Sequence, residues 1–141
     1  MTDARRALVW FKRDLRVADH APLAEAARCE AALALFIVEP AWTGSPECDA
    51  QHVQFTADAL RALRAELDTL NLPLLVRHGE ATAVLAALRR DFAFTDLVSH
   101  EETGPGWSYA RDRAVAAWCR AHGVRWTEWP QTGVVRALPR R

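Results

Sequence analysis

The sequence has few cysteines, no excess of charge of either sign and no long apolar run. Its three cysteines, Cys29, Cys48 and Cys119, are far apart and form no C-x-x-C pair, so they offer neither a zinc nor an iron–sulfur ligand set. Their odd number favours reduced thiols. No apolar segment approaches the roughly 18 residues that a membrane span needs. We therefore expect a cytoplasmic protein with no bound metal and no membrane contact.

Charge and motif content exclude several functional classes. The 18 basic residues are balanced by 18 acidic ones, so the broad positive field of a stand-alone nucleic-acid-binding domain is missing. The sequence also lacks the G-x-x-x-x-G-K phosphate loop, the G-x-G-x-x-G dinucleotide turn and the G-x-S-x-G nucleophile elbow. With 141 residues, half of them hydrophobic, the chain can form one core and is too short for two ordinary domains.

Strand and helix patterns alternate five times along the chain. Continuous apolar runs predict buried strands at 7–11 and 31–38, and three further strands are predicted at 73–77, 95–99 and 124–127. Helical patterns lie between them, at 22–28, 51–70, 80–90 and 108–122, and residues 43–49 read as a loop. This alternation predicts an α/β fold, a three-layer Rossmann-like arrangement of a five-stranded parallel sheet with helices on both faces. In the helix at 51–70, the spacing predicts one buried stripe, made of Phe55, Ala59, Leu60, Leu63, Leu67 and Leu70.

Polar clusters follow the predicted strands and should therefore share one edge of the sheet, where open parallel sheets bind ligands. Arg13, Asp14 and Arg16 follow the first strand, and we interpret them first as ion pairs that brace the loop. His100 with Glu101 and Glu102 has the residue types of a metal site, but no further ligand at a suitable spacing accompanies them.

Two further features lie outside the strand ends. An exposed charge pair within the last helix explains Arg111 and Asp112 adequately. The tryptophans at loops or element ends, Trp42, Trp107 and Trp129, could stack on a planar ligand or dock against another domain.

Two segments, in the correct order, resemble the DNA photolyase and cryptochrome family. They are WFKRDLRVADHAPLAEA, residues 10–26, and HEETGPGWSYARDRAVAAWCRAHGVRWTEWPQTGVVR, residues 100–136. The resemblance covers nearly the whole chain and implies the amino-terminal α/β domain of such a protein, at residues 1–129. It further implies that residues 130–141 are an extended tail toward an FAD-binding helical domain that the chain does not contain.

The resemblance also assigns roles to individual residues. Arg13, Asp14, Arg16 and Asp19 match the family's first motif, and Arg111 with Asp112 matches an arginine–aspartate pair, all in structural roles. For an antenna pigment the resemblance implies a pocket at the rim of the sheet, with Phe11, Lys12, Glu39, His100, Glu101 and Trp107 as candidates. The pigment would be a flavin, a deazaflavin, a lumazine or a folate, or none is bound, and HEETG departs from the commonest folate-binding pattern.

The resemblance implies a domain that is not catalytic by itself. The parent protein would be a photolyase, a carbon–carbon lyase, or a related light sensor. Its FAD and its contact with damaged DNA would belong to the carboxy-terminal domain. Two alternatives stay open: a free-standing nucleotide-binding module of the same fold, like stress proteins or electron-transfer flavoproteins, and a purely structural interaction domain.

Overall fold

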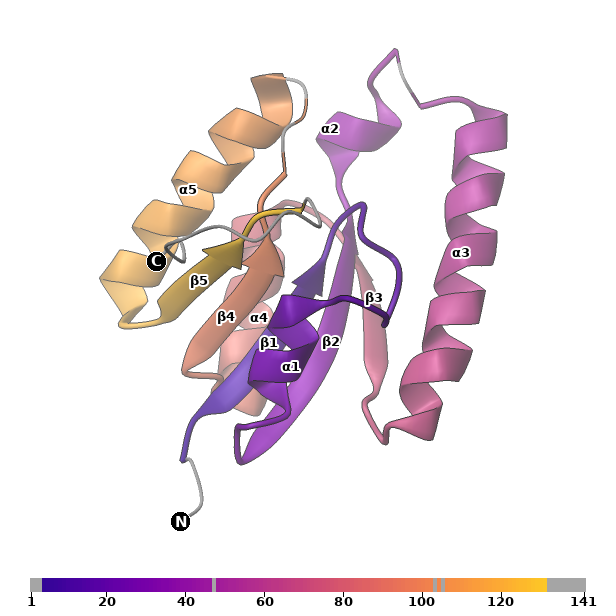
Figure 1. Ribbon diagram of the computed structural model, residues 1–141. Coiled ribbons are helices and arrows are strands. Elements are labelled where there is room, and N and C mark those ends of the chain that lie inside the picture. Colours follow the sequence, from indigo (N-terminus) through magenta and orange to yellow (C-terminus); the bar gives the residue numbers. More distant parts are fainter. Residues whose placement is uncertain (1–3, 47, 103, 105, 132–141) are drawn as a thin grey trace.

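The computed structural model describes residues 4–46, 48–102, 104 and 106–131. Five strands form one parallel sheet, in the order β3-β2-β1-β4-β5. The strands are β1 (Arg6–Phe11), β2 (Ala31–Val38), β3 (Leu74–His78), β4 (Asp96–His100) and β5 (Arg125–Trp129). The helices are α1 (Ala21–Ala26), α2 (Pro40–Thr43), α3 (Ala50–Thr69), α4 (Ala81–Phe92) and α5 (Gly106–His122). The predicted α/β class is therefore confirmed (Figure 1).

The core has two halves, one on each face of the sheet. On one face Leu8 and Trp10 of β1 pack with α4 and α5, and on the other Val9 and Phe11 pack with α1 and α3. All four side chains are almost fully buried. Because side chains alternate along a strand, a continuous apolar run fills both halves at once. This explains why β1 has no polar residue between Ala7 and Phe11.

Residues with a left-handed backbone end three of the helices. Asn71 (φ 59°) follows α3, and Ala93 (φ 57°) is the C-cap of α4. Gly123 (φ 70°) follows α5, as expected for a residue that must leave a helix without steric cost. These ends return the chain to the bottom of the sheet, so that every strand starts there and points toward the same upper edge (Figure 1).

Three expectations from the sequence are wrong. Residue 43 belongs to α2, because Pro40 starts a short helix directly after β2. Phe55 and Leu70 do not join the buried stripe of α3, since they are 74% and 58% exposed. The last strand does not end at residue 127, since β5 extends to Trp129, which packs partly buried against the core half of α1 and α3.

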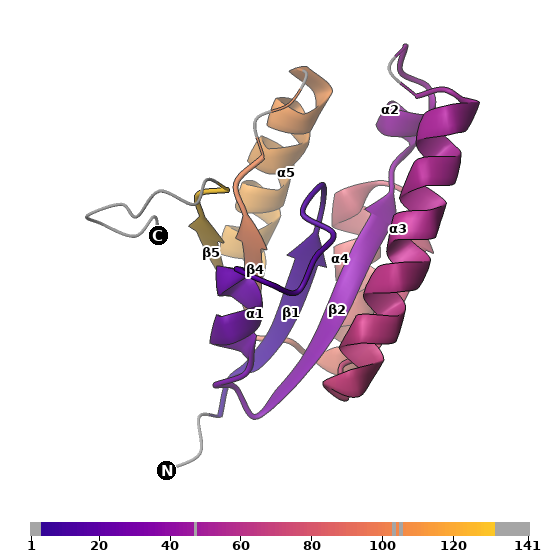
Figure 2. The ribbon, with the colours of Figure 1, turned by 45° about the vertical axis from the view of Figure 1, so that its right-hand side comes forward.

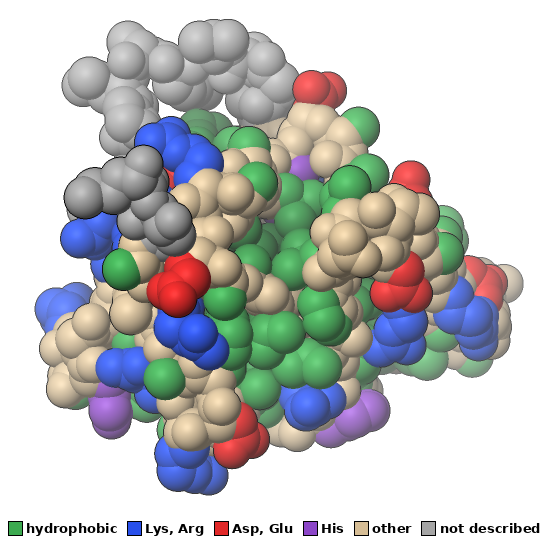
Figure 3. Space-filling model, turned by 90° about the horizontal axis from the view of Figure 1, so that it is seen from below, with side chains coloured by type: hydrophobic (Ala, Val, Ile, Leu, Met, Phe, Trp, Pro, Cys, Tyr) green, Lys and Arg blue, Asp and Glu red, His purple; other side chains and the backbone are tan. Residues whose placement is uncertain are grey.

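Hydrophobic side chains also reach the surface at the lower end of the molecule. Viewed from below, they gather at the centre of this face, with charged side chains around them (Figure 3). Within the described residues, no helix is long and apolar enough to span a membrane. The expected division into residues 1–129 and a tail at 130–141 stays a prediction, because residues 132–141 lie outside the described part.

Candidate functional site

The turn after β1 folds back on itself at the upper edge of the sheet. The Lys12 amide donates to Asp14 Oδ1 (2.9 Å), and the Arg16 amide donates to the Asp14 carbonyl (2.8 Å). The Lys12 side chain turns inward: it is 8% exposed, and its Nζ donates to the His100 carbonyl (3.2 Å). Burial lowers the pKa of Lys12.

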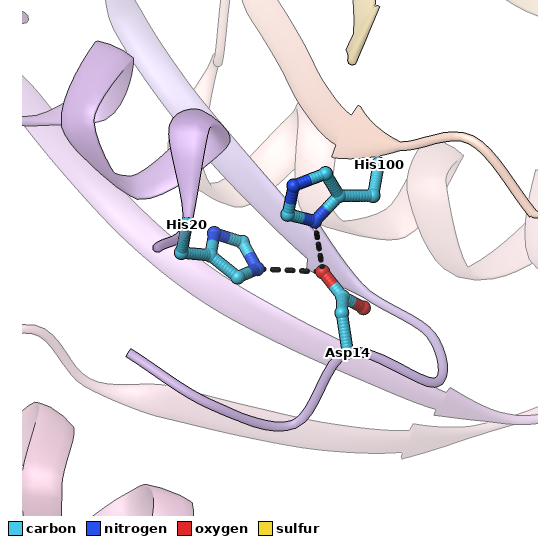
Figure 4. A group of neighbouring side chains, drawn as sticks. All are labelled: Asp14, His20 and His100. Atoms are coloured by element: carbon cyan, nitrogen blue, oxygen red, sulfur yellow. Dashed lines mark hydrogen bonds and ion pairs between the residues drawn. The ribbon is translucent and has the colours of Figure 1, made fainter. Parts of the chain in front are cut away.

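Asp14, His20 and His100 form a buried cluster in which three separate segments meet (Figure 4). Asp14 Oδ2 lies 2.6 Å from His20 Nε2 and 2.8 Å from His100 Nδ1. The three residues come from the turn after β1, the N-cap of α1 and the last position of β4. Burial alone would raise the pKa of Asp14, but hydrogen bonds from His100, His20 and the Lys12 amide outweigh it and hold this pKa well below its usual range.

This cluster has the residue types of a metal site, but its hydrogen bonds favour a brace. His20 Nδ1 accepts a hydrogen bond from the Leu23 amide (3.2 Å), so the proton of the neutral ring is on Nε2, which faces Asp14. A metal bound to His20 Nε2 would replace the proton there, and Nδ1 carries no proton because it accepts from Leu23. Metal-bound histidines normally donate from their other nitrogen. The absence of a bound metal stays a prediction, which this geometry supports.

A second cluster ties the ends of β2 and β4 to α5 through Arg111. Its guanidinium pairs with Glu39 (2.5 Å), with Asp112 (2.8 Å) and with Glu102. Arg13 joins the same cluster, since its Nε lies 2.9 Å from Glu102. The Arg111 side chain is only 8% exposed, which corrects the expectation of an exposed charge pair on the last helix. The three carboxylates can be partly buried because each forms an ion pair with the Arg111 guanidinium.

The pKa of Glu39 is altered by its place in this cluster. Burial raises its pKa to about 7, because the favourable effect of Arg111 is smaller than the loss of hydration and Glu102 lies nearby. The same carboxylates raise the pKa of Arg111 against the opposing effect of burial. Glu39 therefore changes charge near neutral pH, while Arg111 stays a cation.

A cavity of about 440 Å³ opens beside this cluster. Trp42 of α2, Phe55 of α3 and Trp107 of α5 line it, together with Phe11 of β1 and Phe36 of β2. These helices surround the upper edge of the sheet, where the strands end (Figure 2). This is the edge at which parallel α/β sheets bind their ligands. The remaining lining side chains include the charged group of Lys12, Arg13, Glu39, Glu102 and Arg111.

The candidate residues divide between the cavity and its supports. Phe11, Lys12, Glu39 and Trp107 line the cavity, whereas His100 and Glu101 are not among its lining residues. His100 bonds to Asp14, and the Glu101 amide donates to the Trp129 carbonyl (2.7 Å).

The motif residues that remain hold the loop that leads into α1. Arg16 donates to the carbonyls of Ala18 (3.0 Å) and Asp19 (3.2 Å). Asp19 itself adopts a left-handed backbone (φ 50°), which allows this loop to turn sharply before His20.

Two important residues were missed from the sequence, and a third was named without its partners. His20 carries a usable signal, because it directly precedes Ala21 and Pro22, where a helix begins and an N-cap acceptor is needed. Phe55 carries none, since its spacing is that of a core residue. Arg111 was identified only as a structural residue, and nothing in the sequence places Glu39, 72 residues away, beside it.

Comparison with known proteins identifies the family. The sequence model of DNA photolyase matches residues 7–137. The chain is 31% identical over 105 residues to a cryptochrome DASH of Oryza sativa subsp. japonica, covering 69% of this chain and 18% of that protein. It is 35% identical over 111 residues to a deoxyribodipyrimidine photo-lyase of Halobacterium salinarum, covering 69% and 22%. The chain thus spans about a fifth of these curated relatives.

Solved structures agree with this assignment. An archaeal photolyase from Sulfolobus tokodaii superposes with a TM-score of 0.78 at 25% identity, covering 89% of this chain and 29% of that one. A bacterial class III photolyase from Agrobacterium tumefaciens has the same fold, with a TM-score of 0.81 at 21% identity over 92% of this chain and 26% of that one. Fold, ordered motifs and family match agree: the chain belongs to the DNA photolyase family and corresponds to its amino-terminal α/β domain.

Proposed function

We propose that this domain holds a light-absorbing pigment in the cavity at the upper edge of the sheet and serves as the antenna of a photolyase or cryptochrome-like flavoprotein. The observation that carries the proposal is the cavity itself: about 440 Å³, walled by Trp42, Phe55 and Trp107. Its volume is in the range of small-molecule sites. The Sulfolobus tokodaii relative, described with two FAD molecules and an implied light-harvesting cofactor, supports the same role.

The residues around the cavity fit a planar group. Aromatic walls can stack against a flat ring system. A flavin, a deazaflavin, a lumazine and a folate each have such a ring system. When bound, the pigment absorbs light and passes its excitation to a flavin.

In this proposal the domain does not break bonds by itself. The catalytic FAD and the contact with damaged DNA belong to a carboxy-terminal helical domain of the whole protein, whose activity is that of a carbon–carbon lyase or a light sensor. The balanced charge of the chain supports this division, because it gives no broad positive surface for DNA. We place the protein in the cytoplasm, since its three cysteines are free thiols.

Titration of the purified 141 residues tests the proposal. Riboflavin, a deazaflavin, a lumazine and methenyltetrahydrofolate are added in turn, and tryptophan fluorescence reports binding. We expect saturable micromolar binding of at least one of them, weakened about tenfold by Trp42→Ala. Tyr109→Ala, which removes an exposed aromatic ring outside the cavity lining, should not change the affinity.

Other results would contradict it. Binding of none of the four pigments would exclude the antenna role, and saturable binding of ATP alone would favour the nucleotide-binding module. Blue-light repair of pyrimidine dimers by these 141 residues would contradict the proposed division of labour.

A further inference from the structure

Helix α2 is held to the rest of the molecule by few interactions. None of its four residues is buried, and it stands at the upper edge of the sheet between α5 and α3 (Figures 1 and 2). Within the described part of the chain, its hydrogen bonds reach only neighbours in the segment 39–45; the Thr43 amide, for example, donates to the Glu39 carbonyl (3.1 Å). Burial of apolar side chains therefore does little to fix this helix in place.

The Glu39 side chain links the start of α2 to α5. Glu39 is the N-cap of α2, but its carboxylate makes no hydrogen bond to this helix and instead pairs with Arg111 (2.5 Å). Both side chains are at most 10% exposed, so the ion pair is largely withdrawn from water. Trp42 lies three residues further along the chain and lines the cavity. Among the described residues, this ion pair is what anchors the Trp42 wall of the cavity to α5.

Glu39 shares Arg111 with two other carboxylates, so an ionised Glu39 receives only part of the charge of the guanidinium. Burial raises the pKa of Glu39 to about 7 for this reason. When Glu39 ionises, it regains hydration by moving outward with α2, and little else opposes that movement. The charged groups around the Glu39 carboxyl are Arg111 and Asp112 of α5 and Glu102 of the segment after β4, and Lys12, Arg13 and His52 also line the cavity.

We propose that Glu39 and Arg111 form a latch for α2: with Glu39 protonated, α2 and Trp42 stay against the cavity, and with Glu39 ionised, α2 moves outward and opens it. The latch controls access to the cavity and needs no bound pigment, so it goes beyond the proposed function. The closed state keeps its proton up to about pH 7, whereas the open state, with Glu39 in water, keeps it only up to the ordinary pKa of 4.5. Opening therefore becomes about tenfold more favourable between pH 6 and pH 8.

Proteolysis of the folded protein measures this opening. Chymotrypsin cleaves after aromatic residues in segments that detach from the fold, so the rate of cleavage after Trp42 follows the population of the open state. The wild type and Glu39→Gln, whose side chain has a similar shape and stays neutral, are digested at pH 6 and pH 8, and mass spectrometry identifies the fragments. We expect the ratio of the wild-type rate to the variant rate to rise about tenfold between the two pH values. This ratio removes the pH dependence of the protease and the effects of the other charged groups, which both proteins contain.

Two controls separate the latch from other causes. Glu80→Gln changes the same residue type at the N-cap of α4, where the side chain is exposed and makes no cap hydrogen bond, and it should behave like the wild type. Cleavage after Phe11, which is buried in β1, reports global unfolding and should be much slower than cleavage after Trp42. A ratio for Glu39→Gln that does not rise with pH, or cleavage after Trp42 that is no faster than after Phe11, would overturn the latch and leave the proposed antenna function intact.

Discussion

Two carboxyl groups at the upper edge of the sheet have pKa values shifted in opposite directions. Asp14 receives three hydrogen bonds and stays ionised in the folded protein, whereas Glu39 shares its cation with other carboxylates and loses more to burial than it gains. The same kind of group thus stabilises the fold as an anion at one position and as a neutral acid at the other.

Asp14→Asn should destabilise the domain by about 2–3 kcal/mol at pH 7, because an amide oxygen in the place of Oδ2 leaves an NH2 group in the place of Oδ1, where it opposes the Lys12 amide N–H. Urea denaturation measures the change. Asp58→Asn, at an exposed position on α3, serves as the control and should change stability little. In the wild type, Asp14 contributes fully to the free energy of unfolding above its unfolded-state pKa. This contribution is lost as the pH falls through its lower folded-state pKa. Equal stability of the two variants would contradict the role of Asp14 as a brace.

Glu39 gives the opposite pH dependence. Its folded-state pKa of about 7 exceeds the ordinary 4.5, so the folded protein keeps a proton that the unfolded chain has lost. The contribution of Glu39 to the free energy of unfolding is fully present below its ordinary pKa and is lost as the pH rises through 7. Between pH 5 and 8 the wild type should therefore lose on the order of 2–3 kcal/mol relative to Glu39→Gln. Denaturation curves of both proteins at several pH values measure this, and parallel pH profiles would exclude the titration of Glu39.

At the scale of elements, α3 is longer than the sheet that it covers. Its 20 residues span about 30 Å, whereas the five residues of the neighbouring β3 span about 17 Å. Leu63 and Leu67 pack on the sheet, and Phe55 lines the cavity. One half of the helix therefore stabilises the core, and the other forms a wall of the site.

Substitutions in the two halves of α3 should separate these roles. Leu63→Ala leaves a hole in the core and should cost about 2–5 kcal/mol of unfolding free energy. Phe55→Ala should change stability by less than about 0.5 kcal/mol, because the ring is mostly exposed, but should weaken pigment binding. Thermal melts and pigment titrations measure both properties. A large loss of stability in Phe55→Ala would show that the ring contributes to the core.

For the molecule as a whole, the sheet order places β1 at the centre. It pairs with β2 on one side and β4 on the other, and Ala7 to Phe11 are at most 1% exposed. Amide hydrogen exchange should therefore be slowest in β1. Within α3 it should be fastest in the exposed first turns, at residues 50–56. Uniform protection along α3 would contradict the division of that helix into two halves.

The sequence alone predicted every strand and the parallel α/β class, because strand and helix patterns alternate along the chain and the two central runs, 7–11 and 31–38, are continuously apolar. The segment 31–38 was predicted with both of its ends, since polar residues flank it on each side. The family motifs were also readable, as they lie in two unbroken segments. The upper edge as the place of the site followed from the fold class, because parallel strands all end on one side.

Tertiary structure alone decided which of these side chains meet. The placement of β4 beside β1 brings His100 to Asp14 across 86 positions, and the end of β2 brings Glu39 to Arg111 across 72. Periodicity identifies the face of a helix but not where the sheet beneath it ends, so the exposure of Phe55 was unpredictable. The sequence determines the elements through local burial patterns, whereas contacts between distant residues, and the pKa values that result, depend on the order in which the strands assemble.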